Sequence, residues 1–170
     1  SKLIPNKEFR IYYSNDLIGT QIGGALKNIY AIAAGVAEGL NLGENAKSAL
    51  ISRSFAEMTR YAKKFKADKN TLFGLSGLGD LILTCSSKNS RNTQFGIKLA
   101  SSKYDNFLDL LKSQEVTEGY YTVKAVYNIS QKKNIDMPIM ESVYNILYKQ
   151  HDLKEELSNL LSRPITEEKI

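Results

Sequence analysis

The sequence IGGALKNIYAIAAGVA, residues 22–37, contains a single charged side chain, that of Lys27. Apolar residues recur through this stretch and just beyond it at alternating steps of four and three: Ile22, Leu26, Ile29, Ala33, Val36 and Leu40. Most of the residues between them are also small or apolar, which is typical of an α-helix that is buried on nearly all sides. The stretch therefore predicts a central core helix.

Lys27 is the first candidate for a functional side chain. A lone ammonium among apolar side chains loses its hydration, so it needs a partner, a ligand or the loss of its proton. Gly23, Gly24 and Ala25 leave little side chain on the turn before it, which lets another backbone or a ligand come close. In the alternative interpretation, the long lysine stem carries the ammonium to the protein surface.

The apolar stretch is nearly long enough to cross a membrane, but its Ala and Gly content, its lysine and its polar flanking segments favour the middle of a soluble domain. The N-terminus has no charged and apolar leader with a cleavage site. One cysteine, Cys85, excludes an internal disulfide and fits a reducing compartment. We therefore expect a cytoplasmic protein without a membrane span.

Composition narrows the class of protein further. With 170 residues, of which 42% are hydrophobic and 24% are charged, the chain fits one globular domain. The net charge of +5 comes from scattered lysines, which gives little support to nucleic-acid binding but is compatible with an anionic small molecule. No Cys/His cluster is present for a metal, and the single histidine, His151, gives little support to histidine-based catalysis.

The chain begins with a short β-prone run at residues 9–13, followed by the turn-prone residues 14–16. One strand cannot form a sheet, so we interpret this run as the last strand of a preceding domain. Residues 1–16 are then the end of that domain and a linker. Residues 17–170 are expected to form a helical domain.

Helices account for nearly all of the remaining sequence. Between residues 44 and 65 the apolar side chains again alternate steps of four and three, and the charged residues are expected on the other faces: Arg53, Glu57, Arg60 and Lys63. Further helices are expected near residues 106–112, 120–132, 138–149 and 152–161. The predicted fold class is therefore all-α, a multi-helix domain.

Two other polar groups stand at places where a helix is expected to begin. Asp80 follows a glycine-rich segment, and Thr84 lies one turn later on the same side if this segment is helical. Ser90 is a good N-cap, and Arg91 beside it would give the helix end a guanidinium fork suited to phosphate. The alternatives are an ordinary helix-start carboxylate for Asp80 and an ordinary cap with a solvated arginine.

Several motifs in a fixed order carry a resemblance to a known family. They are Gly23–Asn28, Gly74–Leu81, Thr84–Cys85, Ser90–Asn92 with Phe95–Gly96, and Glu118–Tyr120. Together they resemble the C-terminal domain of bacterial NAD(P)-dependent glycerol-3-phosphate dehydrogenase, over almost the whole chain. The resemblance implies a helical substrate domain of the 6-phosphogluconate dehydrogenase C-terminal type. It also implies a preceding Rossmann domain, whose glycine-rich fingerprint is missing here.

The resemblance also implies a reaction and a set of site residues. The family interconverts dihydroxyacetone phosphate and sn-glycerol 3-phosphate with NAD(P)H, for glycerophospholipid synthesis. By this resemblance Lys27 is the catalytic acid/base and Asp80 holds it. The implied substrate-binding residues are Lys27, Asp80, Thr84, Ser90, Arg91 and Asn92, and the implied cofactor-binding residues are Arg91, Val116 and Glu118. The missing domain would bind most of the cofactor, so the isolated chain is expected to be inactive.

Two other functions remain open at this point. The chain could be a helical interaction module, in which the helix that carries Lys27 forms the seam of a homodimer. It could also belong to another dehydrogenase of the same superfamily that acts on a larger or non-phosphorylated acid. If the chain is the glycerol-3-phosphate dehydrogenase domain that the resemblance implies, its expected partners are the triose phosphate, the protein's own Rossmann domain and a second copy of the chain.

Overall fold

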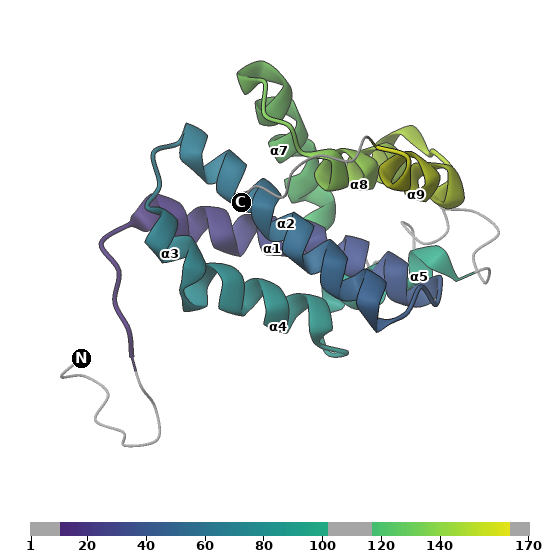
Figure 1. Ribbon diagram of the computed structural model, residues 1–170, viewed down its shortest axis with the longest axis horizontal. Helices are drawn as coiled ribbons and strands as arrows, with labels where there is room; N and C mark the ends of the chain where they lie inside the picture. The colour runs from purple at the N-terminus through teal and green to yellow at the C-terminus, as the bar shows by residue number, and fades with distance from the viewer. Residues whose placement is uncertain (1–10, 102–116, 164–170) are drawn as a thin grey trace.

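The computed structural model describes residues 11–101 and 117–163, and every regular element within these ranges is helical (Figure 1). In chain order the elements are α1 (Leu17–Gly39), α2 (Glu44–Lys64), α3 (Lys69–Phe73), the π-helical turn η1 (Leu75–Gly79), α4 (Asp80–Ser86), α5 (Arg91–Ala100), α7 (Glu118–Lys133), α8 (Pro138–Lys149) and α9 (Leu153–Leu161). The all-α prediction is confirmed. The helix expected at residues 106–112 lies outside the described residues.

Helix α1 runs through the middle of the fold and contacts α2, α3, η1, α4, α5, α7 and α8 (Figure 1). Most apolar side chains in its middle are fully buried, among them Ile29, Tyr30 and Ile32, whereas Leu17 and Ile18 at its start are exposed. This confirms the prediction of a central core helix. Because the chain itself already covers these buried side chains, they are not available for the seam of a homodimer. No described helix is long and apolar enough to cross a membrane.

Helices α1 and α5 pack with their backbones almost in contact. A Cβ atom on Gly35 would lie 2.1 Å from the carbonyl oxygen of Thr93, and one on Gly96 would lie 2.1 Å from that of Ile32. Only glycine permits so close an approach at these two positions. The contact fixes α5 along α1, and so fixes the polar residues at the start of α5 relative to the Lys27 helix.

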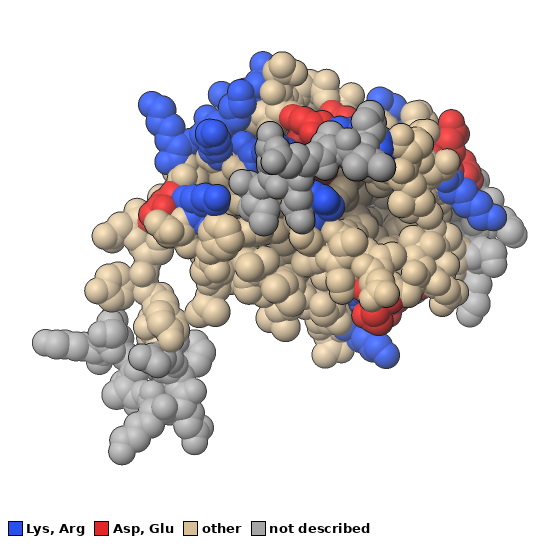
Figure 2. All heavy atoms as spheres, viewed as in Figure 1, with Lys and Arg blue, Asp and Glu red and all other residues tan. Residues whose placement is uncertain are grey.

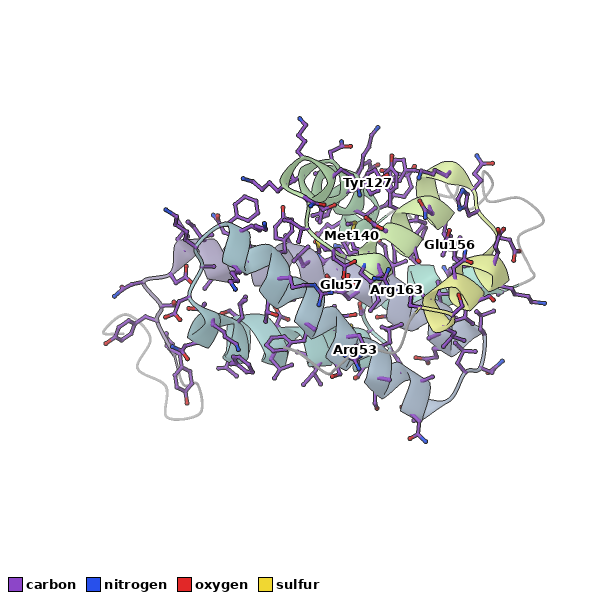
Figure 3. All side chains as sticks on the ribbon, turned by 45° about the horizontal axis from the view of Figure 1, so that its top comes forward. Arg53, Glu57, Tyr127, Met140, Glu156 and Arg163 are labelled. Atoms are coloured by element: carbon purple, nitrogen blue, oxygen red, sulfur yellow. The ribbon has the colours of Figure 1, made fainter. Side chains whose placement is uncertain are left out.

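The apolar face predicted for α2 is confirmed, but the position predicted for Glu57 is wrong. Phe55, Met58 and Ala62 are buried as expected. Glu57 was expected on an outer face with Arg53, but it is only 1% exposed and points toward Met140 of α8 (Figure 3). The prediction for Glu57 was wrong because it used only the spacing within α2 and could not include donors from a distant helix.

Those donors come from the first turn of α8 and from α1. The backbone N–H groups of Ile139 and Met140 donate to the Glu57 carboxylate at 2.6 and 3.1 Å, and the Tyr30 hydroxyl donates at 3.3 Å. The N–H groups in the first turn of a helix have no carbonyl partner within that helix, so the Glu57 carboxylate serves as their acceptor. Burial raises the pKa of Glu57 to about 8, and the two backbone hydrogen bonds and the Tyr30 hydroxyl oppose that rise.

The strand expected at residues 9–13 is not shown. Residues 11–13 have no regular secondary structure, and residues 9 and 10 lie outside the described residues. A strand needs a neighbouring strand for its hydrogen bonds, and the described residues contain none. Helix α1 begins at Leu17, where Asp16 caps it by accepting from Gly19 N at 2.9 Å. The hydrogen bond to Gly19 lowers the pKa of Asp16 below its usual value.

The C-terminal helices follow the sequence closely. Helix α7 contains the predicted segment 120–132, and α8 spans the predicted residues 138–149 with Pro138 in its first turn. Helix α9 begins at Leu153, where the carboxylate of Asp152 accepts from the N–H groups of Lys154 and Glu155. These helices cover one side of α1, while α3 and α4 lie on another (Figure 1).

Candidate active site

Lys27 and Asp80 form an ion pair between α1 and α4. The Lys27 ammonium nitrogen lies 2.5 Å from the Asp80 Oδ2 atom, although the two residues are 53 positions apart in the sequence. The side chains are 23% and 31% exposed. The carboxylate therefore compensates the ammonium that the sequence singled out. Because the pair is partly open to solvent, a small ligand can reach it.

The π-helical turn η1 sets the position of Asp80 by packing its backbone against neighbouring elements. A Cβ atom on Gly77 would lie 2.1 Å from the Leu72 carbonyl oxygen, and one on Gly23 would lie 2.3 Å from that of Ser76. Glycine at both positions lets η1 sit directly on α1 and α3. Asp80 is then the first residue of α4, which continues directly from η1, and its N–H donates to the carbonyl oxygens of Gly77 and Leu75.

We expect Gly23→Ala to lower the free energy of unfolding by about 1–3 kcal/mol, because the added methyl group meets backbone that cannot move without shifting η1. Gly24→Ala is the matched control, since a Cβ atom there would have no neighbour within 4 Å. Urea unfolding of both variants measures the difference. Equal losses of stability in the two variants would contradict the close contact between α1 and η1.

Thr84 lies one turn after Asp80, as predicted, and contacts it. The Thr84 hydroxyl donates to the Asp80 carbonyl oxygen at 2.6 Å and lies 3.3 Å from the Asp80 Oδ1 atom. The Thr84 carbonyl oxygen in turn accepts from the Thr93 hydroxyl on α5 at 2.9 Å. Thr84 can therefore orient the carboxylate and also join α4 to α5.

The Ser90–Asn92 triplet forms the predicted start of α5. The Ser90 hydroxyl accepts from Thr93 N at 3.3 Å, which confirms the N-cap. The Arg91 side chain is 80% exposed and lies 3.3 Å from a Glu118 carboxylate oxygen. An ion pair this exposed contributes little energy, about 0–1 kcal/mol. Its guanidinium therefore stays available to an anion of suitable geometry.

Asn92 is buried and joins three helices. Its amide nitrogen donates to the Asn28 Oδ1 atom at 3.1 Å, and its amide oxygen accepts from Gly119 N at 3.0 Å. Asn28 in turn donates to Glu118 at 3.3 Å. The network connects the residue next to Lys27 with the start of α7. The cofactor-contacting residue expected at Val116 lies outside the described residues.

Asn28 is the site residue that the sequence argument missed. Its side chain is buried and is bonded both to Asn92 and to Glu118. The available signal was an amide in an otherwise apolar helix, directly after Lys27. A buried amide requires hydrogen-bond partners, as a buried charge does, and here α5 and α7 supply them.

The arrangement brings three kinds of polar group to one part of the fold. An ammonium and a carboxylate form a partly exposed pair, and a guanidinium stands at the start of a helix that is packed on the same α1. An ammonium can give or accept a proton and stabilise negative charge on an oxygen. A guanidinium at a helix N-terminus can bind phosphate.

Comparisons with known proteins identify the relatives of this chain. A family model described as the NAD-dependent glycerol-3-phosphate dehydrogenase C-terminus matches residues 16–158. A glycerol-3-phosphate dehydrogenase [NAD(P)+] from Colwellia psychrerythraea is 46% identical over 157 residues, which cover 92% of this chain and 47% of that protein. One from Limosilactobacillus reuteri is 45% identical, over 98% of this chain and 49% of its own length.

Solved structures show the same relation. The crystal structure of glycerol-3-phosphate dehydrogenase from Coxiella burnetii matches with a TM-score of 0.86 and 39% identity, over 93% of this chain and 48% of that one. The yeast glycerol-3-phosphate dehydrogenase matches with a TM-score of 0.79 and 28% identity, over 90% and 45%. This chain thus spans about half the length of its relatives. It belongs to the NAD-dependent glycerol-3-phosphate dehydrogenase family and corresponds to the C-terminal part of those proteins.

Proposed function

We propose that this chain is the catalytic and substrate-binding half of an NAD(P)-dependent glycerol-3-phosphate dehydrogenase. The enzyme would interconvert dihydroxyacetone phosphate and sn-glycerol 3-phosphate, the latter for glycerophospholipid synthesis. The observation that carries the proposal is the Lys27–Asp80 ion pair, partly open to solvent and built on the same helix that holds α5 and Arg91. The relatives, all named for this activity, support the assignment.

Lys27 is the proposed acid/base. During reduction its ammonium donates a proton to the carbonyl oxygen of dihydroxyacetone phosphate as that carbon becomes an alcohol carbon, and in the reverse direction the amine accepts this proton. While it is protonated, it stabilises the negative charge that develops on the oxygen. Asp80 keeps the amine directed toward the substrate, and Thr84 keeps Asp80 in place. NAD(P)H supplies the hydride when it is bound.

The residues around Lys27 leave room for the reacting groups. Gly24 lies one turn before Lys27 on the same side of α1, and a Cβ atom there would have nothing within 4 Å. Ser90, Arg91 and Asn92 would bind the substrate, and the Arg91 guanidinium and the start of α5 would favour its phosphate. Arg91 and Glu118, with Val116, would hold the part of the cofactor that reaches this half of the enzyme.

The partner that would complete the site is the protein's own N-terminal Rossmann domain, which would end within residues 1–16 and precede the helical domain at 17–170. Large apolar side chains stand exposed next to Asp80: Leu75 and Leu83 are each 67% exposed, and Ile82 is 46% exposed. Apolar surface of this kind beside a polar site favours burial against another domain. The domain would bind most of the NAD(P)H and exclude water from the site.

Location and assembly complete the proposal. We place the enzyme in the cytoplasm, where a single buried thiol such as Cys85 stays reduced. The proposed homodimer would use exposed apolar side chains away from the site, such as Leu161, which is 78% exposed. Sedimentation of the full-length protein, with Leu161→Glu as the variant, tests this assembly.

The proposed function is tested by comparing the full-length protein with the isolated 170-residue chain. We expect the full-length protein to oxidise NADPH or NADH with dihydroxyacetone phosphate and to show little activity with dihydroxyacetone, which lacks the phosphate. The isolated chain should show no turnover and no tight NAD(P)H binding, because the main dinucleotide site is missing. Preference for a non-phosphorylated acid, or turnover by the chain alone, would contradict the proposal.

A further inference from the structure

A cluster of cationic side chains, separate from the candidate active site, lies at the C-terminal end of α2. The basic groove, as we call it, has a volume of about 550 Å³ and runs between the C-terminal end of α2 and α3. Four cationic side chains line it: Arg60, Lys63, Lys66 and Lys69. The rest of the lining is neutral and includes Ala62 and Leu72. No acidic side chain lines it. Figure 2 shows Lys and Arg side chains gathered at this end of the molecule (upper left).

Two nearby carboxylates, those of Asp68 and Asp16, are directed at backbone N–H groups and not at these cations. Asp68 accepts from Asn70 N at 2.9 Å, and Asp16 accepts from Gly19 N and Asp68 N. Among the described residues, Lys63 and Lys66 form no ion pair. The groove therefore keeps a local excess of positive charge, which an anion would relieve.

The other two cations are only loosely engaged. Arg60 donates to the Asp136 carbonyl oxygen at 2.8 Å and lies 3.9 Å from its carboxylate, and both side chains are more than a third exposed. The Lys69 ammonium lies 5.4 Å from the centre of the Phe73 ring. Exposed contacts of this kind are weak, so both side chains can turn toward a ligand.

We propose that the basic groove binds a polyphosphate group, of the kind carried by nucleoside triphosphates or by inorganic polyphosphate. Its volume lies within the range of small-molecule sites, about 300–1,000 Å³, and exceeds what a single phosphate fills. Flexible lysine ammonium groups act as point charges that can each meet a different phosphate.

The groove is separate from the candidate active site. Its lining residues lie on α2, α3 and the segment between them, whereas the Lys27–Asp80 pair and Arg91 lie on α1, α4 and α5. No residue belongs to both. Binding in the groove therefore does not depend on the proposed dehydrogenase reaction, and either proposal can fail without the other.

The test uses a double variant that removes two cations without disturbing the backbone. Lys66 has a left-handed conformation with φ +58°, which asparagine adopts readily, so Lys63→Gln with Lys66→Asn should fold normally. Lys149→Gln with Lys154→Gln removes the same charge from α8 and α9, away from the groove, and serves as the control. Arg91→Met reports on binding at the candidate active site.

Titration calorimetry with ATP and with inorganic triphosphate, at low and high salt, measures binding to the chain and to each variant. We expect saturable, salt-sensitive binding. The groove variant should raise the Kd at least about tenfold, which corresponds to about 1.4 kcal/mol. The control variant and Arg91→Met should leave the Kd within about twofold. Tighter binding of ATP than of triphosphate would identify a nucleotide, and equal binding would identify the polyphosphate group alone. Absence of saturable binding, equal weakening in the control, or loss of binding in Arg91→Met would overturn the proposal.

Discussion

Lys27→Met should lower kcat of the full-length dehydrogenase at least about a thousandfold, because the variant loses both the proton donor and the positive charge beside the reacting oxygen. Stability should change far less, by about 1 kcal/mol or less, since the Lys27–Asp80 pair is partly exposed to water. Steady-state kinetics with dihydroxyacetone phosphate and urea unfolding of the same preparations measure the two effects. Turnover close to that of the unmodified enzyme would exclude Lys27 as the acid/base.

The chain contains a matched control for this substitution. Lys47 pairs with Glu38 at 2.7 Å, so Lys47→Met also removes a lysine from an ion pair between two helices. That pair lies at the α1–α2 junction, and we expect kcat to stay within about twofold of the unmodified enzyme. A large fall in kcat with Lys47→Met would mean that loss of an interhelical ion pair, and not loss of an acid/base, explains the effect at Lys27.

Local patterns predicted most of the fold. The alternation of four and three from Ile22 onward indicated α1, and the predicted ranges 138–149 and 152–161 match α8 and α9 to within one residue. These signals succeed because they act within one or two turns of a helix. Glu57 escaped prediction because the groups that make its burial tolerable are N–H donors 82 and 83 residues later in the chain.

The candidate site could be predicted only in part. Lys27 stood out through its apolar surroundings and Asp80 through the glycine-rich segment before it, but the pairing of the two was implied only by the family resemblance. The burial of Asn92 and its bonds to Asn28 and Gly119 could not be predicted, because they depend on how closely α5 and α7 approach α1. The proposed roles of these residues in substrate binding remain predictions that kinetics of the variants will decide.

Glu57→Ala should cause the largest loss of stability of any substitution considered for this chain, about 3–5 kcal/mol. The variant leaves a cavity and removes the acceptor from two buried N–H groups at the start of α8 and from the Tyr30 hydroxyl. Urea unfolding at pH 6 measures the loss. Glu44→Ala, an exposed position on the same helix, is the control and should change stability by less than about 1 kcal/mol.

The pH dependence of stability tests the environment of Glu57 separately. Its pKa in the folded protein, about 8, lies above the ordinary value of 4.5, so the folded state binds this proton more tightly than the unfolded state. The resulting stabilisation is complete below pH 4.5 and is lost as the pH rises to 8, at a rate of at most about 1.4 kcal/mol per pH unit.

Glu57→Gln keeps the size of the side chain but cannot ionise, so this contribution should disappear from its pH profile. The variant should be less stable than the unmodified chain near pH 5, because one amide oxygen replaces two carboxyl oxygens as acceptors, and should approach or exceed it near pH 8.5. Unfolding curves of both proteins across this range measure the difference. Parallel profiles would mean that the carboxyl group keeps an ordinary pKa in the fold, and that the donors from α8 and Tyr30 fully offset the effect of its burial.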